Sequence, residues 1–69
     1  MYTLIRNNVD NYPSVEIQAR GKPTKEKLIA VISQYFDDKI AEKCAEELLT
    51  FGVSDVNDTS CTEYTLKVK

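Results

Sequence analysis

The residues from Asp37 to Gly52 read DDKIAEKCAEELLTFG and decide the fold of this chain. Apolar residues recur in this stretch at the 3.6-residue period of an α-helix, and charged residues fill the positions between them. The Asp pair at its start and the Gly at its end are residues that typically begin and stop such a helix. The buried side of the predicted helix consists of Ile40, Ala41, Cys44, Ala45 and Leu48.

A shorter helix is predicted just before this one. Thr24 is a suitable N-cap, and apolar residues continue the helical pattern to about Phe36. Ile29 and Val31 widen the apolar arc, so we expect this helix to be covered from two sides. Almost nothing joins the two helices, which favours an antiparallel helical hairpin. The buried stripe is predicted to consist of Leu28, Ile32, Tyr35 and Phe36.

Two strands are predicted before the helices. Residues 2–6 are rich in β-forming side chains, and the Asn, Asp and Pro of residues 7–13 indicate a loop. Residues 14–19 then alternate between apolar and polar, which indicates a strand with one buried face. The two strands are expected to pair as a hairpin. The inner face of the second strand is predicted to consist of Val15, Ile17 and Ala19.

Two further strands are predicted after the helices. Val53 to Val56 is a short strand, and a turn follows it at residues 57–60. From Cys61 the chain alternates again, with Thr62, Tyr64, Leu66 and Val68 on the inner face. The order ββααββ predicts a single compact α+β domain over residues 1–69. It combines an N-terminal β-hairpin, a helical hairpin on one face of an antiparallel sheet and a C-terminal strand.

Composition excludes most kinds of catalytic chemistry. The 69 residues contain no His, which is the commonest general base and metal ligand at neutral pH. Two Gly are too few for a phosphate-binding loop, and Cys44 and Cys61 cannot make a four-ligand zinc site by themselves. Cys44 fits the role of a small buried apolar residue. We therefore predict no enzyme activity, no cofactor, no metal site and no catalytic residue.

Charge is unevenly distributed along the chain. Residues 1–36 carry five basic and three acidic residues, whereas residues 37–63 carry eight acidic and two basic ones. An acidic face of this kind can steer a protein toward a basic partner. In the alternative interpretation, Lys39 and Lys43 pair with neighbouring acids along the helix and the face only keeps the protein soluble. The candidate partner-binding residues are Glu42, Glu46, Glu47, Asp55 and Asp58.

The sequence therefore predicts a small cytoplasmic protein-binding module, an inhibitor or regulator of the accessory kind that phages and mobile elements encode. Its longest apolar run, Leu28 to Ile32, has five residues, far below the length of a membrane span. One alternative is weak nucleic-acid binding, with phosphates contacted at the start of the first helix. Another is a structural homo-oligomer, which the wide apolar arc of that helix suggests. The candidate phosphate-contacting residues are Arg20, Lys22, Lys25 and Lys27.

Overall fold

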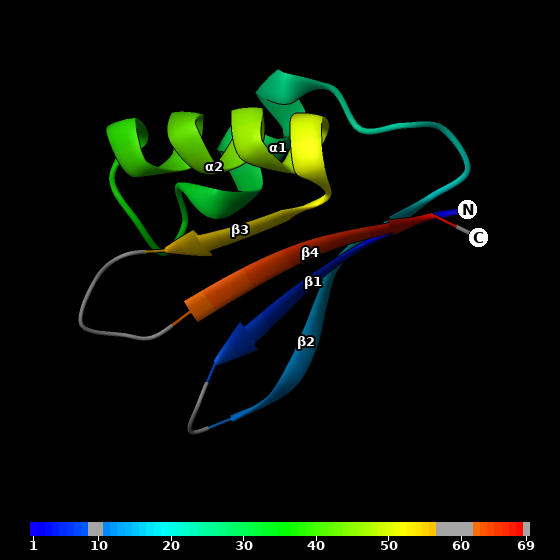
Figure 1. The fold of residues 1–69 in the computed structure, drawn as a ribbon, viewed down its shortest axis with the longest axis horizontal. Coiled ribbons are helices and arrows are strands. Elements are labelled where there is room, and N and C mark those ends of the chain that lie inside the picture. The colour runs from blue at the N-terminus through cyan, green and yellow to red at the C-terminus, as the bar shows by residue number, and fades with distance from the viewer. Residues whose placement is uncertain (9–10, 57–61, 69) are drawn as a thin grey trace.

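The computed structural model describes residues 1–8, 11–56 and 62–68 of the chain. Within these ranges the chain forms strands and helices in the predicted ββααββ order (Figure 1). In chain order they are β1 (Tyr2–Asn8), β2 (Asn11–Ala19), α1 (Lys25–Ile32), α2 (Asp38–Phe51), β3 (Val53–Val56) and β4 (Thr62–Val68). The third strand is the shortest, as the sequence predicts.

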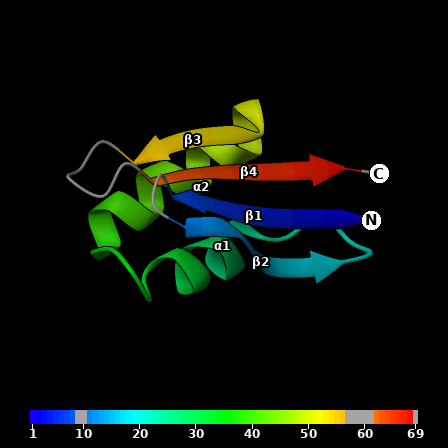
Figure 2. The ribbon, with the colours of Figure 1, turned by 90° about the horizontal axis from the view of Figure 1, so that it is seen from below.

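The strands form one antiparallel sheet in the order β2-β1-β4-β3. The C-terminal strand β4 therefore lies beside β1, and these two strands occupy the centre of the sheet. Both helices lie on one face of the sheet (Figure 1), and nothing in the described ranges covers the opposite face (Figure 2). The predicted α+β fold, with a helical pair on one face of an antiparallel sheet, is confirmed.

Helix α2 begins and ends as its sequence predicts. Asp37 is its N-cap, and the carboxylate accepts a hydrogen bond of 2.9 Å from the backbone N–H of Ile40. Gly52 follows the helix at a φ of 80°, a left-handed conformation that glycine adopts without a steric penalty. The predicted inner side is also confirmed, because Ala41, Cys44, Ala45 and Leu48 are buried and Ile40 packs against them.

Helix α1 begins as predicted but ends early. The Thr24 hydroxyl accepts a hydrogen bond of 3.1 Å from the backbone N–H of Lys27. The helix stops at Ile32, whose carbonyl accepts from the backbone N–H groups of Tyr35 at 3.0 Å and Phe36 at 3.2 Å. Since α2 is already capped at residue 37, residues 33–36 close into a turn rather than continuing the helix. Tyr35, predicted on the buried stripe, is 48% exposed for this reason.

Strand β2 departs from the predicted alternation at a β-bulge. Leu4 of β1 pairs with Ile17, but the next residue, Ile5, pairs with Val15, which leaves Glu16 as an extra residue in β2. The prediction that Val15 faces inward is therefore wrong, and this side chain is 59% exposed. Glu16 turns toward the helices instead and meets Arg6 there. The strands also extend to residues 8 and 11, which the sequence placed in the loop.

Strand β4 alternates as predicted over most of its length. Thr62, Tyr64 and Leu66 are buried beneath the helices, and Glu63 and Lys67 are exposed on the opposite face. Val68, predicted to share the inner face, is 65% exposed because β4 continues beyond the end of α2 (Figure 1). Cys61, predicted to begin this strand, lies outside the described residues.

The hydrophobic core lies between the helices and the sheet and receives side chains from every element. Phe36 meets the ring of Tyr64 edge to face, with ring centroids 6.4 Å apart and an interplanar angle of 77°. The Tyr64 hydroxyl is buried and has no hydrogen-bond partner among the described residues. Burial raises the pKa of this phenol. The largest fully buried side chains are Tyr64, Leu4, Leu28, Ile32 and Leu48.

Candidate protein-binding surface

The acidic residues predicted to bind a partner fall into two groups on opposite sides of α2. Glu42 and Glu46 face α1, where Lys25 places its ammonium 2.8 Å from a carboxylate oxygen of Glu46 and 3.9 Å from one of Glu42. The hydrogen bond to Glu46 raises the pKa of Lys25. This first group of acids is therefore partly neutralised within the chain.

The second group lies toward the edge strand β3. Glu47 accepts a hydrogen bond of 2.8 Å from the Ser54 hydroxyl, which fixes its carboxylate beside the strand. Glu47 and Asp55 border a hollow of about 130 Å³ between α2 and β3, which we call the α2–β3 groove. Its lining consists of Ile40, Lys43, Cys44, Glu47, Asp55 and Val56.

Asp55 also has an acidic neighbour on the open face of the sheet. It lies directly opposite Glu63 of β4 in the strand register. A hydrogen bond to Asp55, and the negative charge of Asp55, raise the pKa of Glu63. Two carboxyl groups in this position repel each other when both are ionised. Asp58, the remaining predicted acid, lies outside the described residues.

The ion pairs expected between the lysines of α2 and neighbouring acids on the same helix are not formed. Among the described residues, neither Lys39 nor Lys43 comes within ion-pair distance of an acid. The cation that meets the acids of α2 is Lys25 of α1, which no spacing along α2 could have indicated. Lys43 instead lines the α2–β3 groove, one helical turn before Glu47.

The candidate phosphate-contacting residues differ in their exposure and in their contacts. Arg20, Lys22 and Lys27 are exposed, as a phosphate-binding segment requires. Lys25 is instead half-buried and engaged with Glu46. One of the four predicted cations is therefore already paired with an acid, and nucleic-acid binding by the remaining three stays a prediction.

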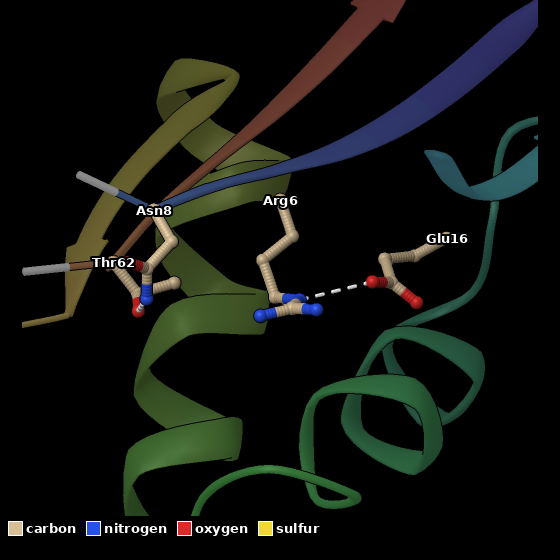
Figure 3. Close-up of polar contacts among 4 residues, drawn as sticks. All are labelled: Arg6, Asn8, Glu16 and Thr62. Carbon is tan, nitrogen blue, oxygen red and sulfur yellow. Dashed lines mark hydrogen bonds and ion pairs between the residues drawn. The ribbon is translucent and has the colours of Figure 1, made fainter. Parts of the chain in front are cut away.

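A polar cluster that the sequence did not indicate lies on the helix-covered face of the sheet (Figure 3). Arg6 Nε donates to Glu16 at 3.0 Å, with only 22% and 11% of the two side chains exposed. The hydrogen bond to Glu16 raises the pKa of Arg6, and the guanidinium carbon lies 4.1 Å from the centre of the Tyr35 ring. Asn8 donates to the Thr62 hydroxyl at 3.2 Å nearby. These residues contact one another within the fold, so we assign the cluster a structural role.

Other kinds of site find no support in the described ranges. No group of His, Cys, Asp and Glu side chains there is arranged to hold a metal ion. Cys44 is buried, as predicted, and forms part of the groove floor. No helix among the described residues has the length and apolar character needed to cross a membrane.

Comparison with known proteins adds no assignment. No protein-family model, curated protein sequence or solved structure matches this chain.

Proposed function

We propose that this chain is a small protein-binding module, an inhibitor or regulator, that accepts a basic side chain of its partner in the α2–β3 groove. The observation that carries the proposal is the chemistry of the groove lining. The lining combines three apolar residues, two acids and one lysine: Ile40, Cys44, Val56, Glu47, Asp55 and Lys43. Neither carboxylate forms an ion pair with a basic residue within the described ranges.

The size of the groove suits one side chain. Its volume of about 130 Å³ is close to that of cavities that hold a benzene molecule, roughly 150 Å³. Arg and Lys pack their aliphatic stems on apolar surface while the charged group stays at a polar rim. An arginine of the partner would lay its stem on Ile40 and Val56 and present its guanidinium to Glu47 and Asp55.

The acids on the other side of α2 have a different role in this proposal. Because Lys25 pairs with Glu46 and lies near Glu42, these carboxylates contribute little to direct contact. They still add negative potential that attracts a basic partner during diffusion, which raises the association rate at low salt. Long-range attraction of this kind is screened beyond about 8 Å at physiological ionic strength.

The groove can be tested with a minimal probe. A glycine-flanked arginine peptide is titrated into the ¹⁵N-labelled chain, and the same peptide with citrulline, the neutral isostere of arginine, serves as the ligand control. We expect the arginine peptide to shift the backbone resonances of Lys43, Glu47 and Val56 and the citrulline peptide to leave them unchanged. The response should fall with added salt.

Matched variants separate the groove from the general charge of the protein. E47Q/D55N removes the two groove carboxylates, and E42Q/E46Q removes the same number of charges from the opposite side of α2. We expect the first variant to lose the response and the second to keep most of it. Equal responses in both variants, or shifts spread over the whole surface, contradict the groove as the binding site.

A further inference from the structure

The open face of the sheet carries a row of β-branched residues that crosses all four strands. Val15 pairs with Ile5, Ile5 pairs with Thr65, and Thr65 pairs with Val53. These four residues form what we call the transverse row. Val15 is 59% and Val53 50% exposed, while Ile5 and Thr65 are half-buried. Figure 2 views the sheet from this face, with both helices behind it.

Charges of opposite sign flank the transverse row on the central strand β4. Glu63 precedes Thr65 by two residues and Lys67 follows it by two, so the pleat places all three on the open face. Both charged side chains are exposed, and neither forms an ion pair within the described ranges. Asp55 lies directly opposite Glu63, and neither acid forms an ion pair with a basic residue in the described ranges, so a cation from a second copy would be favourable there.

We infer that the open sheet face is the interface of a symmetric homodimer, with a second copy of this chain as its occupant. A two-fold axis along the transverse row stacks the row of one copy on the same row of the other. The rotation reverses the strand direction, so Glu63 of each copy faces Lys67 of the other. One surface is thereby complementary to itself in charge, as a two-fold interface requires.

The geometry of sheet packing permits this contact. Packed sheets lie about 10 Å apart, and their strands cross at roughly 30°. At two residues from the axis, this crossing offsets the facing residues of the two copies by only a few ångströms. The long side chains of Glu63 and Lys67 can span that offset. Four of the six residues that line the α2–β3 groove belong to α2. Asp55 lies opposite Glu63 and borders both the groove and the dimer face, so the two proposed sites adjoin at this residue.

The size of the face sets the strength of the dimer. Strands of seven residues at about 3.3 Å each, spaced about 4.8 Å apart, give a face of roughly 400 Å² per copy. Two such faces total roughly 800 Å², below the roughly 1,200 Å² at which stable specific interfaces begin and in the range of weak, transient complexes. The dimer is therefore expected at high protein concentration and not at low concentration.

The wild-type chain is tested first by sedimentation velocity and light scattering over a concentration series up to about 1 mM, which reaches dissociation constants near that value. We expect the average mass to rise from 7.8 kDa toward twice that value. A mass that stays monomeric throughout the series overturns the inference. The homodimer is then excluded even if some other molecule covers this face.

Charge reversals then test the arrangement itself. E63K places two lysines opposite each other across the axis, and K67E places two acids opposite each other. Each variant alone should dimerise at least about tenfold more weakly, because two attractive pairs become two repulsive ones. An equimolar mixture restores both attractive pairs in a heterodimer, so the mixture should associate while the separate variants do not.

Control variants with the same changes in net charge are E26K on α1 and K39E on α2, both at exposed positions away from the sheet. These should dimerise like the wild type. If E63K or K67E dimerises as well as its control, or if the mixture associates no better than the separate variants, the two-fold arrangement is wrong. Circular dichroism of each variant confirms that loss of the dimer is not loss of folding.

Discussion

Replacing Tyr64 with Phe is expected to make the protein more stable. The residue is fully buried, and its hydroxyl has no hydrogen-bond partner among the described residues. A buried polar group without a partner costs about 1–3 kcal/mol. The substitution removes that group and keeps the ring that Phe36 contacts at 6.4 Å.

The expected gain follows from these two effects. Losing the oxygen leaves a void of about 10 Å³, which at about 24 cal/mol per Å³ costs roughly 0.2 kcal/mol. Y64F should therefore raise the free energy of unfolding by about 1–2 kcal/mol. For a domain of this size, each kcal/mol raises the melting temperature by about 4–8 °C. Urea and thermal unfolding followed by circular dichroism measure both quantities.

The same variant has a signature at alkaline pH. The phenol of the unfolded chain ionises near pH 10, whereas burial raises the pKa of Tyr64 in the folded chain. The contribution of Tyr64 to the free energy of unfolding of the wild type is therefore constant below about pH 10 and falls as the pH rises above it. Y64F should not show this fall. Y2F, at a half-buried position, is the matched control and should change stability by less than about 0.5 kcal/mol. If Y64F destabilises the protein by 1 kcal/mol or more, the hydroxyl has a partner and the reasoning fails.

Three further predictions concern other contacts. E16A should destabilise the protein by about 1–3 kcal/mol, because Arg6 loses its partner at 3.0 Å in a mostly buried site; a cycle with R6M that shows no coupling in urea unfolding contradicts this. G52A should cost about 1–2 kcal/mol, since the φ of 80° disfavours any side chain while the added carbon meets only ordinary contact, 3.6 Å from the Leu66 carbonyl oxygen; an unchanged melting temperature refutes it. Because Asp55 raises the pKa of Glu63, repulsion between them weakens stability above that pKa and is relieved as the pH falls through it. E63Q should therefore be more stable than the wild type at neutral pH, and the difference should vanish in acid, as unfolding at several pH values will show.

The parts of the fold set by local interactions could be predicted from the sequence. Thr24, Asp37 and Gly52 act on backbone groups within a few residues of themselves, so their identity alone marks the helix ends. The inner side of α2 follows in the same way from the helical period. The short length of β3 was also evident, since residues 53–56 lie between a helix stop and a turn.

The contacts between distant residues could not be predicted. The bulge at Glu16 accompanies a contact with Arg6 on the neighbouring strand, whereas alternation alone placed Val15 inside. The early end of α1 depends on where α2 is capped. Glu46 is likewise paired with Lys25 of the other helix, so the division of the acids into two groups appears only in three dimensions.

The measurement that tests the proposed function most directly is affinity capture from a lysate of the organism that encodes the chain, followed by mass spectrometry. Immobilised wild type is compared with E47K/D55K and with E42K/E46K, at low and at high salt. We predict that a protein with a basic surface binds the wild type at low salt, is lost with E47K/D55K and at high salt, and is only weakened with E42K/E46K. Equal capture by all three proteins, unaffected by salt, would contradict the account.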